Sequence, residues 1–108
     1  MLRKLLKYEK NDYFLIDSLT AYVLNEMFEN ENKLTKQELI EKLKNDFKCF
    51  LDYYKNVIIV SDYIFSDFEE FSEFTLDYLE IFSSISKYIV CLSDVVVECL
   101  TGKKKILK

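Results

Sequence analysis

The sequence predicts one α/β domain with a mainly parallel sheet flanked by helices and a C-terminal β-hairpin. Short runs of consecutive apolar residues, typical of strands buried on both faces, alternate with longer segments whose apolar residues recur every three or four positions. Strands that alternate with helices favour parallel pairing, because each helix returns the chain to the start of the next strand. The chain length fits a single domain over residues 1–108.

Four short segments are the predicted strands: the mainly apolar runs over residues 13–16, 57–60 and 95–100, and a short last strand over residues 105–108. The second run consists of β-branched residues, which favours a strand. Thr101 and Gly102 supply a turn between the third and fourth runs, so we expect these two strands to pair as a hairpin.

Three amphipathic segments are the predicted helices. Ser18 can cap the first helix, because its hydroxyl can accept a hydrogen bond from a backbone N–H of the first turn. Thr35 and Glu38 form a capping-box pattern at the start of the second helix, which is the clearest amphipathic segment. Asp67 is the predicted cap of a third, long helix that ends at Leu92.

The composition excludes several classes of function. The chain has no histidine, so histidine-based catalysis and metal ligation are excluded. It has one glycine, Gly102, whereas a phosphate-cradling loop needs several glycines so that backbone N–H groups can approach the phosphates. The formal net charge of -4 argues against a nucleic-acid partner, which would favour a basic face.

The sequence also predicts where the protein works. No segment reaches the roughly 18 to 20 apolar residues that span a bilayer, and residues 1–7 lack the apolar stretch of a signal peptide, so we expect no membrane association. Cys49, Cys91 and Cys99 are odd in number and widely spaced, which predicts reduced, partly buried thiols. Reduced thiols favour a cytoplasmic location.

Acidic residues follow the first two predicted strands, at Asp17 and Asp62. Ligands of open α/β sheets bind beyond the carboxyl ends of the strands, and an acid in this position holds Mg²⁺ in many nucleotide-binding folds. Thr20 lies one turn into the following helix, where its hydroxyl can reach a ligand or bond the backbone. The alternative interpretation of Asp17 is a turn or capping acid, and spacing alone favours it.

The motifs resemble a known family. Residues 14–25, FLIDSLTAYVLN, resemble the "LLDCLTLWLSN" segment of the bifunctional adenosylcobinamide kinase / adenosylcobinamide-phosphate guanylyltransferase family of cobalamin biosynthesis. Residues 57–62, VIIVSD, fall where that family has "viVTNEVG", and residues 94–108 resemble its "aDeVwLVvSGiPlklK" terminus. The three matches occur in the family's order and cover nearly the whole chain.

The resemblance implies a P-loop, RecA-like NTPase fold that phosphorylates adenosylcobinamide with ATP or GTP and then transfers GMP through a covalent histidine intermediate. It implies that Asp17 corresponds to the Walker B-type acid near Mg²⁺, and that Thr20 and Asp62 lie in nucleotide-binding positions. Thr20 keeps the family's identity, whereas Asp62 replaces an asparagine. GTP or ATP with Mg²⁺ is therefore the cofactor set that the resemblance suggests.

The resemblance also implies a truncated fold. Members of the family carry the phosphate loop and the GMP-accepting histidine in an N-terminal third, so this chain is expected to match the remaining two-thirds and to have no catalytic residue of its own. The first hypothesis is a truncated relative that is not catalytic alone. The alternatives are a half-enzyme completed by a separate N-terminal chain and an unrelated α/β interaction module. A missing strand would leave an exposed sheet edge, so we expect a homo-oligomer or a complex with that separate half.

Overall fold

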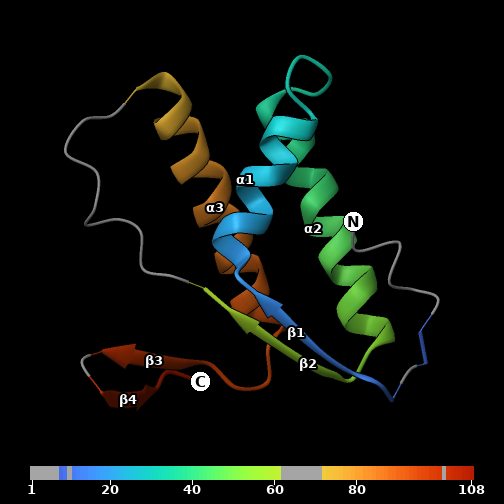
Figure 1. Ribbon diagram of the computed structural model, residues 1–108, viewed down its shortest axis with the longest axis vertical. Coiled ribbons are helices and arrows are strands. Elements are labelled where there is room, and N and C mark those ends of the chain that lie inside the picture. Colours follow the sequence, from blue (N-terminus) through green and yellow to red (C-terminus); the bar gives the residue numbers. More distant parts are fainter. Residues whose placement is uncertain (1–7, 10, 62–71, 101) are drawn as a thin grey trace.

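The computed structural model describes residues 8–9, 11–61, 72–100 and 102–108. Within these ranges the chain forms a β-α-α-β-α-β-β succession (Figure 1), which agrees with the order predicted from the sequence. The elements are β1 (Tyr13–Asp17), α1 (Leu19–Glu29), α2 (Lys36–Tyr53), β2 (Asn56–Val60), α3 (Glu73–Leu92), β3 (Val97–Leu100) and β4 (Lys103–Ile106).

The caps of the first two helices are those that the sequence predicts. The Ser18 hydroxyl accepts a hydrogen bond from the backbone N–H of Ala21, at 3.3 Å. At the start of α2, the backbone N–H of Glu38 donates to Thr35 Oγ1 at 3.1 Å, and the backbone N–H of Thr35 donates to Glu38 Oε1 at 3.0 Å. This reciprocal pair is a complete capping box, and the bond from the Thr35 backbone is the main reason why the pKa of Glu38 is lowered.

The cap of α3 differs from the prediction. Ser72 has an extended backbone, and its hydroxyl accepts a hydrogen bond from the backbone N–H of Thr75 at 3.2 Å, so the described helix begins at Glu73. The predicted cap, Asp67, lies outside the described residues. Serine is as good a cap as aspartate, so spacing alone could not distinguish the two positions.

The described strands form two small sheets. β1 and β2 pair in parallel, from Tyr13 opposite Asn56 to Asp17 opposite Val60. β3 and β4 form an antiparallel hairpin, and no ladder joins the hairpin to the parallel pair within the described ranges. The structure is thus a mixed α/β fold with a small parallel sheet and helices, rather than one continuous sheet.

The last strand of the hairpin begins earlier than predicted. The last strand was expected over residues 105–108 but begins at Lys103, directly opposite Leu100. Gly102 has a φ angle of 78°, in the left-handed region that a two-residue hairpin turn requires and that glycine tolerates best. The short turn therefore brings the lysine-rich segment into the ladder.

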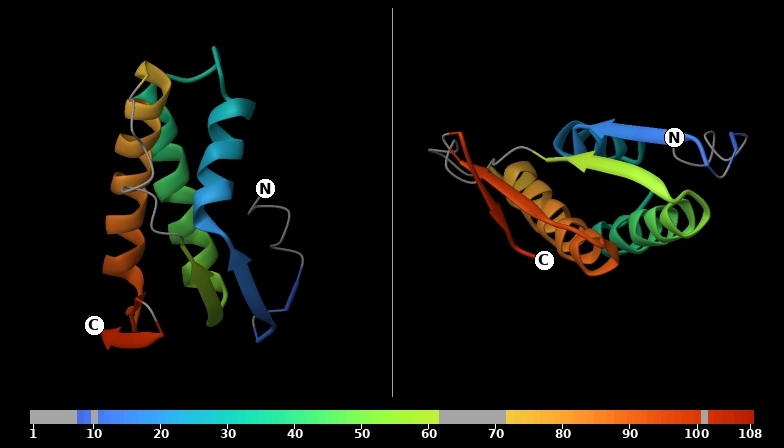
Figure 2. Two further views of the ribbon diagram at one scale, coloured as in Figure 1. Left: turned by 60° about the vertical axis from the view of Figure 1, so that its left-hand side comes forward. Right: turned by 90° about the horizontal axis from the view of Figure 1, so that it is seen from below.

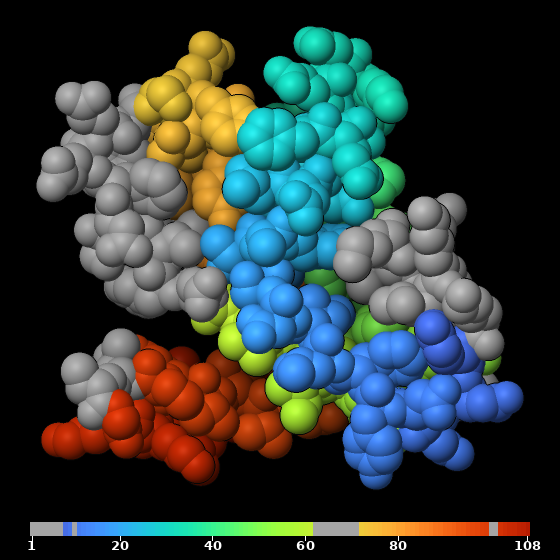
Figure 3. All heavy atoms as spheres, in the orientation of Figure 1, coloured from blue at the N-terminus to red at the C-terminus, as the bar shows by residue number. Residues whose placement is uncertain are grey.

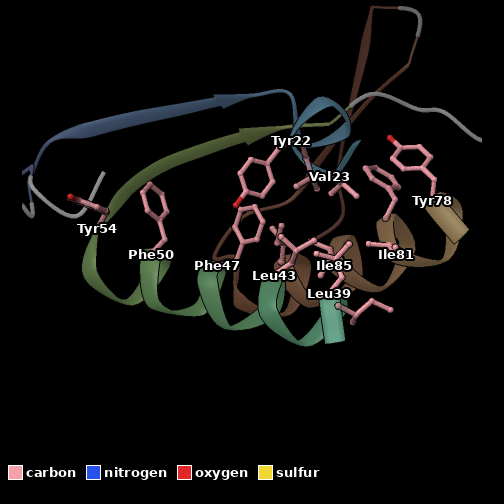
Figure 4. Close-up of a cluster of buried hydrophobic side chains, with 14 residues drawn as sticks. Tyr22, Val23, Leu39, Leu43, Phe47, Phe50, Tyr54, Tyr78, Ile81 and Ile85 are labelled. Atoms are coloured by element: carbon pink, nitrogen blue, oxygen red, sulfur yellow. The ribbon is translucent and has the colours of Figure 1, made fainter. Parts of the chain in front are cut away.

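The core lies between two layers. Figure 2, right, shows β1, β2 and α1 in one layer and α2 and α3 in the other. Between them pack side chains that are almost completely buried (Figure 4), contributed by all three helices. The buried apolar residues are Leu19, Tyr22, Val23, Leu39, Ile40, Leu43, Phe47, Phe50, Tyr54, Tyr78, Ile81, Phe82, Ile85 and Ile89.

Only one face of the parallel sheet is covered by described residues. The inward side chains, which include Phe14 and Ile59, pack against the helical core. On the opposite face Leu15 is 65% exposed and Ile58 is 66% exposed. The prediction that both strands are buried on both faces is therefore wrong for the described part of the chain, because α2 and α3 lie on the same side of the sheet.

Leu43 offers a test of this core. Its side chain is 0% exposed, so Leu43→Ala is expected to lower the free energy of unfolding by about 2–5 kcal/mol through lost burial and the cavity that remains. Urea denaturation followed by circular dichroism measures the change. Leu76→Ala is the matched control, because Leu76 is 54% exposed and should change stability by no more than about 0.5 kcal/mol. Equal losses in both variants would contradict the described packing.

Candidate functional site

Asp17 lies at the carboxyl end of the parallel sheet. It is the last residue of β1, is exposed, and stands opposite Val60, the last residue of β2, so both strands end at the same edge. A cis peptide bond links Asp17 to Ser18, which begins α1 as its cap. The structure therefore places this carboxylate where α/β sheets bind ligands.

Thr20 lies beside this edge, in the first turn of α1, and is half-buried. Its backbone carbonyl accepts a hydrogen bond from the Tyr78 hydroxyl at 3.1 Å, which holds the start of α1 against α3. The third predicted site residue, Asp62, lies outside the described residues, one position after Ser61. The structure thus brings Asp17 and Thr20 to one end of the sheet.

The described residues do not form a metal cage at this edge. In that part of the chain, no group of three or more histidine, cysteine, aspartate or glutamate side chains is placed to hold a metal ion. Mg²⁺ usually keeps several waters and takes one or two carboxylates together with substrate phosphates. The exposed Asp17 carboxylate fits such a partial role, but it does not define a metal site by itself.

A second polar cluster joins α1 to α2. The Lys42 ammonium lies 3.3 Å from a Glu26 carboxylate oxygen and 3.3 Å from an Asp46 carboxylate oxygen. Glu26 is 3% exposed and Asp46 is 6% exposed. The Asn30 side-chain amide also donates to Glu26 Oε2, at 3.2 Å. Two nearly buried carboxylates are therefore held by one cation and by further hydrogen bonds.

The electrostatics of this cluster favour a structural role. Burial is the largest single influence on Lys42 and lowers its pKa, but the nearby Glu26 and Asp46 carboxylates together outweigh burial and raise the pKa above its usual value. A lysine with a raised pKa keeps its proton at neutral pH and is a poor general base. Glu26 also lies seven residues after Leu19, about 10 Å along the axis of α1, so the cluster is separated from Asp17 at the start of that helix.

The sequence interpretation missed this cluster, although one signal was available. Lys42 and Asp46 are four residues apart on α2, a spacing that places them on one helix face. Asp46 also borders the apolar stripe that contains Leu43 and Phe47, so partial burial could have been expected. The pairing with Glu26 could not be read from spacing, because it depends on how α1 packs against α2.

The three cysteines are more exposed than the sequence predicts. Cys49, Cys91 and Cys99 are free but exposed, so the predicted partial burial is wrong. The first two lie on α2 and α3 outside the buried apolar stripes, and the third lies on the hairpin.

In the described ranges, no helix has both the length and the apolar character needed to cross a membrane.

The arrangement defines a mixed α/β protein with a small parallel sheet and helices, in which Asp17 lies at the carboxyl edge of the parallel pair. A family model described as cobinamide kinase / cobinamide phosphate guanyltransferase matches residues 1–107. The chain therefore belongs to this family and is a relative of the kinase/guanylyltransferases of cobalamin biosynthesis. This confirms the resemblance and excludes an unrelated interaction module. Searches among curated proteins and among solved structures found no match.

The Glu26–Lys42–Asp46 cluster generates a prediction. Lys42→Met should lower the free energy of unfolding at pH 7 by about 1–3 kcal/mol, less than for a fully buried pair because Lys42 is partly exposed. Since the pKa of Lys42 is raised in the folded chain, the stabilisation is complete below the usual value of 10.5 and is lost as pH rises through the folded pKa. Urea denaturation of both proteins from pH 7 to pH 12 measures the difference.

Lys48→Met is the matched control, because Lys48 pairs with Asp52 at 3.1 Å and both side chains are exposed. Its effect on the free energy of unfolding should be close to zero, because water and salt screen an exposed ion pair. A Lys42→Met effect no larger than that of the control would show that the buried carboxylates do not depend on Lys42.

Proposed function

We propose that this chain is a relative of the cobinamide kinase/guanyltransferases that does not transfer phosphoryl or guanylyl groups by itself. One observation supports the proposal: the β1–α1 framework of the family motif is folded, while the 108 residues contain no histidine and a single glycine. A GMP-accepting histidine cannot come from these residues. A phosphate loop cannot be built from them either, because its backbone N–H groups need several glycines.

The finer architecture belongs to the same proposal. We assign residues 1–108 to one domain that corresponds to the later two-thirds of a P-loop, RecA-like NTPase fold. Gly102 lies in the hairpin turn between β3 and β4 and has a φ angle of 78°. This glycine therefore allows the turn and is not part of a nucleotide-binding loop. The missing chemistry would have to come from a segment outside these residues.

The edge at Asp17 is the part of the family site that the chain retains. Its carboxylate is exposed at the end of β1, where it can accept hydrogen bonds from the waters of a hydrated Mg²⁺, and Thr20 lies in the following turn. Asp62 is proposed as a further nucleotide contact by its place after β2. Without a phosphate loop, these groups supply at most weak affinity for GTP or ATP.

A second candidate is a half-enzyme that another polypeptide completes. The uncovered face of β1 and β2 favours it, because both strands are apolar on a side that no described element covers. A homo-oligomer is the other form of association that would cover this surface. The three free thiols fit a cytoplasmic place of action for either form.

Calorimetric titration of the chain with GTP or ATP and Mg²⁺ tests the proposal. We expect no binding with a Kd below about 1 mM and no phosphorylation of cobinamide, because a sequence with one glycine cannot form a loop that cradles the phosphates. The opposite outcome is micromolar binding that Asp17→Asn abolishes and that the exposed α1 control Glu29→Gln preserves. That result would show a surviving nucleotide site and would make the half-enzyme the better interpretation.

A further inference from the structure

The C-terminal hairpin has few attachments to the rest of the described structure. No ladder joins β3 and β4 to β1 and β2, and among the described side chains no hairpin residue belongs to the core cluster or packs against it. Val97 and Ile106, which lie opposite each other in the ladder, are 46% and 73% exposed. Figure 3 shows the hairpin in red at one end of the molecule. Because an isolated two-stranded hairpin is marginally stable in water at best, its attachment to the rest of the chain decides whether it keeps its place.

The carboxyl end of α3 needs hydrogen-bond donors from outside the helix. The last four backbone carbonyls of an α-helix have no N–H partner within the helix. Ser93 supplies two donors: its hydroxyl donates to the Ile89 carbonyl at 2.6 Å, and its backbone N–H donates to the Val90 carbonyl at 3.3 Å. The last turn of α3 contains no basic side chain to balance the negative end of the helix dipole. A cation from another part of the chain would therefore stabilise this end.

Lys108 supplies that cation. Its ammonium donates to the Val90 carbonyl at 2.9 Å and to the Cys91 carbonyl at 3.2 Å. The backbone N–H of Leu107 donates to the Val96 carbonyl at 2.8 Å, which continues the pairing of the hairpin back to the loop after α3. Figure 2, left, shows the hairpin at this end of α3. In the described part of the chain, no other hydrogen bond joins the hairpin to α3.

This attachment is open to water. The Lys108 side chain is exposed, and so are Val90 and Cys91 at the end of the helix. Water can therefore replace each of the two hydrogen bonds, and salt can screen the attraction between the ammonium and the helix dipole. The contact holds the hairpin reversibly, in contrast to the buried contacts that hold the three helices together.

We propose that the two hydrogen bonds of Lys108 are a latch that decides the position of the hairpin. With the ammonium on the carboxyl end of α3, β3 and β4 are held at that end. When both bonds break, the hairpin moves away from α3 as one unit, because its ladder is internal and none of its described side chains packs in the core. This opening needs no unfolding of the helices and does not depend on whether the chain binds a nucleotide.

The position of the hairpin can be measured through two of the exposed cysteines. Nitroxide labels on Cys49 of α2 and Cys99 of β3, in a Cys91→Ser background, report the distance between the helical layer and the hairpin by electron–electron double resonance. Lys108→Met, which keeps the length of the side chain and removes its charge, should broaden this distance distribution or add a second distance. Lys108→Arg, which keeps the charge and the donors, should restore the single distance of the unaltered chain.

Hydrogen exchange locates the same opening without labels. In Lys108→Met the amides of Val97–Leu100 should exchange at least about fivefold faster, because two charge-assisted hydrogen bonds no longer hold the hairpin closed. The amides of Leu43 and Phe47 in α2 should exchange as before, since these residues lie in the core. Lys103→Met is the matched control, because Lys103 is an exposed lysine on β4, and it should change neither measurement.

Three outcomes would overturn the inference. The first is a Lys108→Met variant whose distance distribution and hairpin exchange match those of the unaltered chain. The second is an equal change in Lys103→Met, which would make the effect one of general charge. The third is faster exchange of Leu43 and Phe47 together with the hairpin, which would show that Lys108 supports the whole fold rather than the position of β3 and β4.

Discussion

The packing of the parallel strands onto α2 is the interaction on which the rest of the structure depends. The centroid of the Phe14 ring of β1 lies 5.4 Å from the centroid of the Phe50 ring and 4.3 Å from that of the Tyr54 ring. These aromatic contacts hold the first strand against the end of the second helix. The Tyr54 hydroxyl donates to the backbone carbonyl of Tyr8 at 3.2 Å. Because β1 is held in this way, Asp17 and the start of α1 have a defined place at the sheet edge.

Packing of the described helices onto the parallel strands involves one face of the sheet only. α2 and α3 bury the inward side chains of β1 and β2, and the outward ones meet no described element. Among the described residues, the parallel pair is thus packed on one face only. On the outward face Tyr13, Leu15 and Ile58 are exposed, and large contiguous apolar patches are uncommon on soluble monomeric proteins.

Part of the site could be predicted from the sequence. Asp17 was placed correctly at the end of a strand because four consecutive apolar residues precede it, and Thr20 because a capping serine precedes it by two positions. The cluster of Glu26, Lys42 and Asp46 was not predicted, because burial of a carboxylate depends on which helix packs over it. Spacing within α2 shows only the Lys42–Asp46 pair.

By itself, the sequence determined the kind and order of the elements, two of the three helix caps and the family. These features are local: apolar periodicity, capping side chains and short motifs act within a few residues. Only the tertiary structure decided that the described strands form two separate sheets, that no described residue covers one face of β1 and β2, and that Ser72 caps α3. Those features depend on contacts between segments that are distant in the sequence. The apolar sequence of β2 is compatible with a strand covered on one face or on both, so local patterns could not decide between them.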